Sequence, residues 1–556
     1  MTRGEALGQV RAALAQEGFV EQADEEPTFH GTLAVAGRAF SIRIAFPCLR
    51  FARLPVVQLL RRGEELPGVH AHVERDDRLC YAAPGSLVLD MYEPGNNALT
   101  VLSVVRCALA QMLGDAAEAD LRAEFPQHWM GGNVHVALPL GSADGPAALL
   151  GMPRLGAPPL LILTRPAGMG AGYLGGAMGR LGGRPLAKAW VLRTDLPLRI
   201  APGSSLPATY RDLLDWAAFV DPALPQRMRQ AARDEFFRED IYFFVSAPNG
   251  WAGARLILPL LWEKSCRRKE FWAAMLTDKA AAIGLELLSG TRMDAELART
   301  RNLEGTPRLA GRSIVLVGCG TIGGHLARFL AQSGAGDRGR LLLFDDDTLA
   351  AGNLGRHLLG PEHIGSNKAL ACAEEIGRHF PHANVQGFSE RIQERFGVLA
   401  TADLLIDATG EEALSRALNH EVMIRRPGGP AAIFVWLVGQ GAAAEALYVP
   451  DRADGRGCLV CRRPHGAARS AMRTDVPVQV VPAACGEAAF VPYGVPAPAI
   501  AAGLAARMAL EWAKGDVRPS FRTVRVDHGA TSGTVDEDTA ARVGCPACGH
   551  AGDGQG

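Results

Sequence analysis

The chain has 556 residues, of which 48% are hydrophobic and 21% are charged, with 58 basic residues against 59 acidic ones. This composition excludes a mainly disordered chain, and the length predicts roughly three or four domains. The balanced charge gives no reason to expect a nucleic acid or an anionic membrane as a partner. We also expect neither a signal peptide nor a bilayer span, because no stretch has the required apolar composition.

The chain contains eleven cysteines, an odd number. With no signal peptide expected, this count predicts a protein of the reducing cytoplasm. The thiols are then expected to bind metal or to react, rather than to form disulfides.

Residues 1–120 show the pattern of a small α+β domain. An amphipathic helix is predicted over 1–18. Apolar residues alternate on both sides of the turn at 36–38, which predicts a β-hairpin. A strand or extended segment is expected at 86–92, and a helix from Asn97 to Leu113.

Residues 121–290 give weaker signals. They are rich in glycine and proline over 131–184, and helical patterns follow at 229–240 and 270–288. No set of residues here suggests catalysis. We interpret this region as a spacer, either a docking domain or an inactive adenylation-like domain.

Residues 291–556 alternate short apolar runs with helical patterns. Strands separated by helices of 10–15 residues predict an α/β fold with a doubly wound, Rossmann-like parallel sheet. The expected strands are 313–318, 340–345, 383–389, 403–408 and 431–438, and the expected helices are 323–334, 367–380, 412–423 and Pro496–Lys514.

A glycine-rich turn joins the first of these strands to its helix, with Gly318, Gly320 and Gly323 in a G-x-G-x-x-G pattern. Glycines allow a tight turn close to phosphates, and the start of a helix offers free N–H donors to anions. Asp345 ends the next strand, where an acceptor for ribose hydroxyls is expected. This much fits an NAD-dependent dehydrogenase as well as an enzyme that uses ATP.

The residues after the second strand separate these two possibilities. Asn353, Arg356 and Lys368 follow it, and Lys368 is one of only six lysines in the chain. Hydride transfer develops no triphosphate charge, whereas attack of a carboxylate on an α-phosphate needs cations around the phosphates. The pattern therefore favours adenylation.

With these motifs the segment resembles the ThiF/MoeB/ubiquitin-activating adenylation family over about 250 residues. The family pattern is a glycine loop, D-x-D (Asp345 and Asp347), N-L-x-R (Asn353 to Arg356) and G-x-x-K, ending at Lys368. The resemblance implies binding of ATP and Mg²⁺, with Asp345 on the ribose and Asn353, Arg356 and Lys368 around the phosphates.

One departure from the family concerns the metal. The family has a Mg²⁺-binding Asp in D-x-T-D, where this chain has Asp407 and then Gly410. Coordination of Mg²⁺ would then fall to Asp407, Glu411 or Asp347, and the sequence does not choose among them. The family also takes an arginine from the partner subunit, for which two residues upstream of the first strand are candidates: Arg299 and Arg301.

Two C-x-x-C pairs lie in the last hundred residues. Such pairs present thiolates to one tetrahedral ion, and two of them complete a Cys₄ site. We predict a closed structural Zn²⁺ site, as in the resembled family. Its ligands are Cys458, Cys461, Cys545 and Cys548.

Cys485 precedes the helix expected at Pro496–Lys514 and resembles the cysteine of ubiquitin-activating enzymes that takes the acyl group as a thioester. Attack of a thiol on an acyl-adenylate is favourable, because AMP is a good leaving group. The alternative is that Cys485 is a small buried hydrophobic residue.

Cys80 lies ten residues after His70 and eight after His72. This spacing resembles ubiquitin-conjugating enzymes, which carry His-Pro-Asn about ten residues before their thiol. His72 replaces the Asn that supports the oxyanion, and a neutral imidazole could donate one hydrogen bond there. Three cysteines without a comparable context are expected to be core residues: Cys48, Cys107 and Cys266. No catalytic role is expected for Cys319 or Cys372.

The order of the two resemblances is similar to that of the conjugating–activating fusions of antiphage CBASS operons, the CD-NTase-associated ligases. This likeness implies activation of the C-terminal carboxylate of a carrier, either a ubiquitin-like protein or a CD-NTase. Cys485 and then Cys80 would carry the acyl group to a target lysine, in a homodimer.

Three other classes stay open. The first is a sulfur-carrier adenylyltransferase of the ThiF/MoeB type with a non-catalytic N-terminal domain. The second is an NAD-dependent dehydrogenase, and the third is a binding platform without catalysis.

Overall fold

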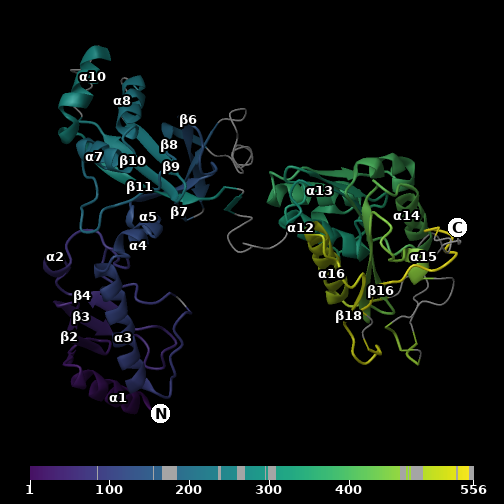
Figure 1. The fold of residues 1–556 in the computed structure, drawn as a ribbon, viewed down its shortest axis with the longest axis horizontal. Helices are drawn as coiled ribbons and strands as arrows, with labels where there is room; N and C mark the ends of the chain where they lie inside the picture. Colours follow the sequence, from purple (N-terminus) through teal and green to yellow (C-terminus); the bar gives the residue numbers. More distant parts are fainter. Residues whose placement is uncertain are drawn as a thin grey trace, which may run out of the picture. The chain divides into compact units, whose positions relative to one another are not determined.

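The computed structural model divides the chain into two compact units, Met1–Asp294 and Ala295–Gly556, and each is described by itself (Figure 1). The structure describes residues 1–83, 85–154, 156–165, 184–235, 240–259, 269–294, 296–297, 308–463, 471–473, 475–477, 492–533 and 536–549.

The first unit begins with a four-stranded antiparallel sheet in the order β1-β2-β3-β4. The predicted hairpin is confirmed, because β2 and β3 pair across a turn in which Ala36 and Gly37 have φ of +48° and +75°. The predicted helices at 1–18 and 97–113 are also found, and they pack on each other and enclose an apolar core against the sheet. The elements are α1 (Arg3–Gln16), β1 (Val20–Gln22), β2 (Thr28–Val35), β3 (Arg38–Ala45), β4 (Val56–Leu59), α2 (Arg62–Glu65) and α3 (Pro94–Leu113).

The rest of the first unit is a closed barrel in the strand order β10-β11-β5-β7-β6-β8-β9. Helices pack on the barrel around a core that includes Trp129, Tyr210 and Phe243. The elements are α4 (Ala117–Ala123), α5 (Phe125–His128), β5 (Gly132–Val136), β6 (Gly145–Arg154), β7 (Ala157–Thr164), β8 (Arg184–Arg193), α7 (Tyr210–Val220), α8 (Leu224–Asp234), β9 (Asp240–Ala247), β10 (Gly250–Ile257), α10 (Lys269–Asp278), η1 (Ala280–Ala282) and β11 (Gly284–Arg292).

The helical pattern predicted at 270–288 is wrong in its second half. The helix ends at Asp278, and Gly284–Arg292 forms β11 between β10 and β5. A short apolar run such as that at 285–288 fits a strand or a helix equally well, and pairing with distant strands decides between them.

The second unit is a seven-stranded sheet in the order β14-β13-β12-β15-β16-β17-β18. The first five strands are parallel, as predicted, and the last two pair antiparallel. The sheet confirms the α/β, Rossmann-like fold class. The elements are β12 (Ser313–Val317), α12 (Thr321–Gln332), β13 (Arg340–Phe344), η2 (Ala351–Asn353), η3 (Pro361–His363), α13 (Lys368–His379), β14 (Val385–Phe388), η4 (Ile392–Thr401), β15 (Leu404–Asp407), α14 (Glu412–Ile424), β16 (Ala431–Val438), β17 (Ala443–Val449), α15 (Leu459–Arg462), α16 (Pro496–Lys514) and β18 (Phe521–Arg525).

Both faces of this sheet are covered. Ile314 and Leu316 of β12 face a core shared with α12, α13 and α16, whereas Val315 and Val317 face a core shared with α14 and η4. Alternate residues of a strand point to opposite faces, so a sheet buried on both faces has continuously apolar strands. This explains the apolar runs in the sequence.

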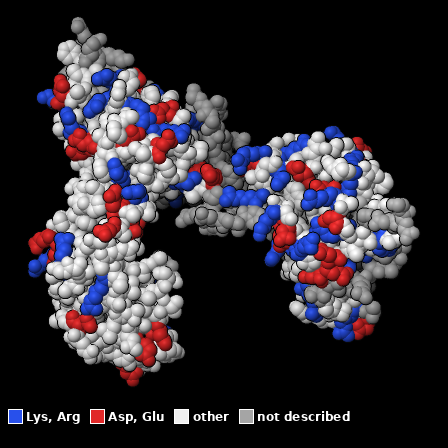
Figure 2. Space-filling model, viewed as in Figure 1, with Lys and Arg blue, Asp and Glu red and all other residues white. Residues whose placement is uncertain are grey.

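Neither sign of charge dominates the face of the molecule seen in Figure 2. Figure 2 shows acidic and basic side chains interspersed over the face in view of each unit. This distribution agrees with the near-zero net charge.

Among the described residues, no single helix is long and apolar enough to cross a membrane. Helices α3 and α4 together have the length and apolar composition of a membrane span, but the chain bends by 99° between them.

Candidate active sites

The glycine turn follows β12 directly, and two of its glycines, Gly318 and Gly323, are required by its backbone geometry and close packing. Gly318 has φ of +86°, and a Cβ on Gly323 would lie 1.8 Å from the carbonyl oxygen of Gly318. Gly320 is the N-cap of α12, and nothing lies within 4 Å of the position of a Cβ there. The turn therefore folds tightly and leaves the start of the helix open to a ligand.

Asp345 holds this turn from the end of β13. Its carboxylate accepts the backbone N–H of Cys319 at 2.6 Å and that of Asp347 at 2.9 Å. Burial raises the pKa of Asp345, and the backbone hydrogen bonds oppose this rise. The predicted ribose acceptor thus lies beside the glycine turn.

His357 also contacts the glycine turn, and no sequence motif singled it out. Its Nε2 lies 2.8 Å from the carbonyl oxygen of Cys319, and its Nδ1 accepts the N–H of Leu359 at 3.1 Å. Since Nδ1 accepts, Nε2 carries the proton and donates to Cys319. The only feature of the sequence that could have pointed to His357 is its position directly after Arg356.

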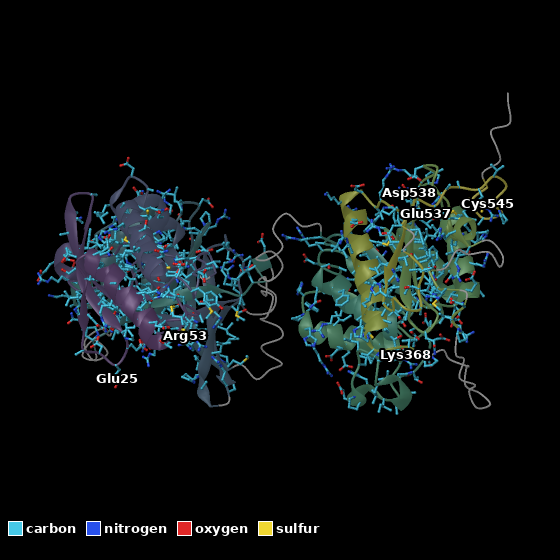
Figure 3. All side chains as sticks on the ribbon, turned by 90° about the horizontal axis from the view of Figure 1, so that it is seen from below. Glu25, Arg53, Lys368, Glu537, Asp538 and Cys545 are labelled. Carbon is cyan, nitrogen blue, oxygen red and sulfur yellow. The ribbon has the colours of Figure 1, made fainter. Side chains whose placement is uncertain are left out.

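Lys368 (Figure 3) is buried at the first turn of α13 and forms an ion pair with Asp347. Burial alone would raise the pKa of Asp347, but the hydrogen bond and charge of Lys368 outweigh it and lower that pKa. Asn367 caps α13, and its amide donates to the carbonyl oxygen of Asp345 at 2.7 Å. The D-x-D and G-x-x-K motifs therefore form one connected structure.

Asn353 and Arg356 occupy different surroundings. The Oδ1 of Asn353 accepts the N–H of Ala350 at 2.9 Å, so its side chain closes a local turn. The guanidinium of Arg356 lies 5.2 Å from the ring centroid of Tyr493, whose hydroxyl is 2.7 Å from Oγ1 of Thr321. Their predicted contact with phosphates stays a prediction.

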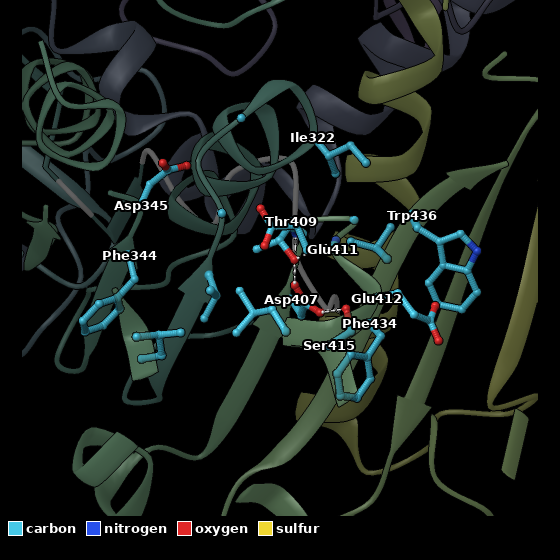
Figure 4. A pocket seen from close by; sticks show the side chains of 18 of the residues that line it. Ile322, Phe344, Asp345, Asp407, Thr409, Glu411, Glu412, Ser415, Phe434 and Trp436 are labelled. Carbon is cyan, nitrogen blue, oxygen red and sulfur yellow. Dashed lines mark hydrogen bonds between the residues drawn. The ribbon is translucent and has the colours of Figure 1, made fainter. Parts of the chain in front are cut away.

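A pocket of about 1280 Å³ opens along the carboxyl ends of the parallel strands. In Figure 4 Asp345 lies at one side of the pocket and Trp436 at the other, with Asp407 between them. The pocket brings together six of the predicted nucleotide-site residues, and Gly323, Asn353 and Arg356 do not line it. The six are Gly318, Gly320, Asp345, Asp347, Lys368 and Asp407.

Asp407 is 2% exposed, and its carboxylate is used locally. Its Oδ1 accepts the N–H of Thr409 at 3.0 Å and the hydroxyl at 2.7 Å, and its Oδ2 accepts the hydroxyl of Ser415 (Figure 4). Burial raises the pKa of Asp407, and these hydrogen bonds oppose the rise. The carboxylate therefore lines the pocket with its oxygens already engaged in ordering the start of α14.

Two further carboxylates line the pocket beside Asp407. Glu412 forms ion pairs with Arg416 at 2.8 Å and Arg463 at 2.9 Å. Glu411 is exposed in the pocket, and among the described residues its carboxylate has no ion pair. Glu411 thus has the free oxygen ligands that Mg²⁺ prefers.

The four cysteines of the two C-x-x-C pairs lie together in the second unit, away from Lys368 (Figure 3). All four Sγ atoms lie within 4.8 Å of one another. The Sγ atoms of Cys461 and Cys548 are 3.5 Å apart, those of Cys458 and Cys545 are 3.8 Å apart, and those of Cys458 and Cys461 are 4.0 Å apart. Tetrahedral zinc with Zn–S bonds of about 2.3 Å requires S···S distances of about 3.8 Å. The four cysteines therefore fit Zn²⁺, because they supply four sulfur ligands at the distances that a tetrahedral zinc ion requires.

Replacing Cys461 with serine is expected to lower the zinc content and to reduce Tm by about 10 °C, because a structural zinc contributes to folding directly. Metal analysis and calorimetry measure the two effects. Cys107→Ser, which alters an exposed thiol of α3, is the matched control. Purified protein without bound metal and with an unchanged Tm in the variant would contradict the zinc site.

In the first unit, Cys80 ends a short hairpin and is exposed. Val73 and Leu79 form an antiparallel bridge, and the N–H of Cys80 donates to the carbonyl oxygen of His72 at 2.8 Å. His72 and Cys80 therefore face each other across the hairpin. Burial and then the charge of Glu124 raise the pKa of the Cys80 thiol.

His72 contacts a carboxylate that the sequence analysis missed. Its Nδ1 lies 2.7 Å from Oε1 of Glu124, and its backbone N–H donates to Oε2 at 2.9 Å. His128 contacts the same carboxylate at 3.3 Å through Nε2. No local pattern pointed to Glu124, which is 52 positions away in the sequence.

The other cysteines differ in burial. Cys319 and Cys372 are fully buried, whereas Cys107 is exposed on α3, so the expectation that Cys107 is a core residue is wrong. The predicted residues Cys266, Arg299, Arg301 and Cys485 lie outside the described residues.

Two protein families match the chain. Residues 294–545 match the ThiF family, and residues 4–134 match prokaryotic E2 family B. The chain is 30% identical over 514 residues to the ATP-dependent ubiquitin transferase-like protein Cap2 of Pseudomonas aeruginosa, covering 90% of each chain. It is also 30% identical over 280 residues to the protein of the same name in Escherichia coli, covering 48% of this chain and 47% of that one.

The two family matches and the relative covered over 90% of its length define an ATP-dependent activating and conjugating enzyme. The pocket at the glycine turn lies in the residues that match the first family, and the exposed hairpin thiol lies in those that match the second. The predicted resemblance is thereby confirmed. The chain belongs to the family of ATP-dependent ubiquitin transferase-like proteins.

Proposed function

We propose that the second unit adenylates the C-terminal carboxylate of a carrier protein and that thiols relay the acyl group to a target lysine. The order is Cys485, then Cys80, then an isopeptide bond. The observation that carries this proposal is a single pocket that combines the glycine turn, Asp345 and the buried cation Lys368. A carboxylate is a poor electrophile, and its conversion to an acyl-adenylate makes attack by a thiol possible.

Each pocket residue has a chemical role in this proposal. The N–H groups at the start of α12 would bind phosphate oxygens, and Asp345 would accept the ribose hydroxyls. Lys368, released from Asp347, would balance the charge that develops on the phosphates. Mg²⁺, when bound, would supply further neutralisation of the triphosphate.

For Mg²⁺ we favour Glu411 over Asp407, since the Asp407 carboxylate is buried and accepts three hydrogen bonds. Glu411→Gln is expected to raise the Mg²⁺ concentration for half-maximal pyrophosphate exchange about tenfold. A titration of exchange against MgCl₂ measures this. Glu374→Gln, an exposed residue of α13, is the control. The same Mg²⁺ dependence in both variants would point back to Asp407 or Asp347.

The partners follow from the chemistry. The carrier is a ubiquitin-like protein or a CD-NTase that ends in glycine, and the acceptor is a lysine of a target protein. We place the reaction in cytoplasmic antiphage defence of the CBASS type and expect a homodimer.

The alternative is a sulfur-carrier adenylyltransferase. It accounts for the pocket and the cysteine quartet but assigns no role to the exposed Cys80.

ATP–pyrophosphate exchange tests the proposal. We expect exchange only when a carrier with a free C-terminal carboxylate is added, using the proteins encoded beside this gene. Removal of the last carrier residue is the control, because it displaces the reacting carboxylate. Absence of exchange with every such carrier would overturn the proposal.

A further inference from the structure

The short hairpin that ends at Cys80 is contacted by a carboxylate from outside it, that of Glu124. Glu124 ends α4 and precedes α5, where the chain enters the barrel. The next turn is fixed to the barrel, because the indole N–H of Trp129 donates to the carbonyl oxygen of Gly253 at 2.9 Å. A carboxylate anchored in this way has a defined position relative to the hairpin.

Glu124 makes contact with two atoms of His72. Oε2 accepts the backbone N–H at 2.9 Å, and Oε1 lies 2.7 Å from Nδ1 of the ring. The same backbone has φ of +61°, a left-handed conformation that is uncommon for histidine. The carboxylate therefore holds both the main chain and the imidazole of His72.

The protonation of the ring follows from this contact. An ionised carboxylate only accepts hydrogen bonds, so Nδ1 must carry a proton. Burial alone would raise the pKa of Glu124, but hydrogen bonds from His128 and His72 outweigh it and lower that pKa, which keeps the carboxylate ionised. In the neutral imidazole, Nε2 then has a free lone pair. A neutral His72 in this tautomer can accept a proton at Nε2 and has none to donate there.

We infer that Glu124 is a positioning residue for conjugation: it fixes the proton of His72 on Nδ1, so that Nε2 serves as the base for the attacking lysine amine. This inference rests on the proposed function, in which Cys80 carries the acyl group. It also changes the expected role of His72 from oxyanion donor to proton acceptor.

The step is balanced as follows. The neutral lysine amine attacks the thioester carbonyl carbon, and a C–N bond forms. Nε2 of His72 takes one proton from the amine nitrogen, and the C–S bond breaks. The sulfur of Cys80 leaves as a thiolate with the bonding electron pair, and the products are an amide and an imidazolium.

Glu124→Gln separates this role from a purely structural one. The glutamine oxygen can still accept the backbone N–H of His72, whereas its NH₂ group would donate to Nδ1. The ring proton would then move to Nε2, and the base would be lost with little change in shape. Glu118→Gln, in the same helix and paired with Arg122 at 3.1 Å, is the matched control.

The experiment uses the full chain and a probe that bypasses ATP. A peptide ending in glycine, supplied as its mercaptoethanesulfonate thioester, acylates Cys80 by thiol exchange, and mass spectrometry locates the acyl group. Discharge is then followed with N-acetyl-lysine amide and, separately, with hydroxylamine. Hydroxylamine is mostly neutral at neutral pH and attacks thioesters without a base.

We expect Glu124→Gln to slow discharge to lysine about 100-fold and to leave discharge to hydroxylamine unchanged. In a His72→Asn background the same change should have no further effect on lysine discharge, since the base is already absent. Equal loss with both nucleophiles, or no loss with either, would overturn the inference. Failure of the unsubstituted enzyme to discharge Cys80 to lysine would contradict the proposed function, and the inference with it.

Discussion

Lys368→Ala is expected to reduce carrier-dependent ATP–pyrophosphate exchange by about 10²–10³-fold. The ammonium group lies in the pocket beside the glycine turn, is 8% exposed as a residue, and pairs with Asp347. A buried cation stabilises negative charge on a phosphate far better than a cation in water, because the effective dielectric constant around it is lower. Exchange of labelled pyrophosphate into ATP, at saturating carrier, measures the effect.

Lys514→Ala is the matched control, because Lys514 is an exposed lysine at the end of α16. Its exchange rate should equal that of the unsubstituted enzyme. Since removal of Lys368 leaves Asp347 without its cation, calorimetry should accompany the assay. Full exchange in a folded Lys368→Ala enzyme would refute its place at the phosphates.

Cys80→Ala is expected to reduce the rate of target modification at least about 10³-fold and to leave the rate of pyrophosphate exchange unchanged. The thiol is exposed at the end of its hairpin, and the pocket belongs to the other unit. An assay that follows carrier–target conjugates on denaturing gels, beside the exchange assay, separates the two activities.

Cys107→Ala is the control for thiol loss, because Cys107 is also an exposed cysteine of the same unit. Conjugation should continue in this variant. If Cys80→Ala conjugated its target normally, the sulfur-carrier alternative would gain support, since it gives Cys80 no task.

Much of the second unit could be predicted because its signals are local. The bounds expected for the last helix, Pro496–Lys514, are those of α16, which begins with proline and ends before Gly515 at φ of +86°. The glycine turn, the acidic strand end and the cysteine pairs are likewise encoded within a few residues each. Apolar runs with helices between them leave few alternatives to a parallel sheet.

The barrel and the surroundings of Cys80 could not be predicted, because distant residues determine them. β11, the last barrel strand in the sequence, pairs with β10 and with β5, the first barrel strand in the sequence. Glu124 contacts His72 across 52 positions, and neither residue has a neighbour that signals the contact. The side chain of Asn353 bonds within its own turn, an outcome that the family motif does not contain.

The cysteine quartet has a topological consequence. Cys461 and Cys545 belong to different C-x-x-C pairs, so one bound ion would close the intervening chain, with α16 and β18, into a ring. For a covalent cross-link over a loop of this length, the loss of denatured-state entropy amounts to about 4.6 kcal/mol. A protease cut inside the ring would leave both pieces fastened to each other through sulfur and metal until a chelator removed the ion.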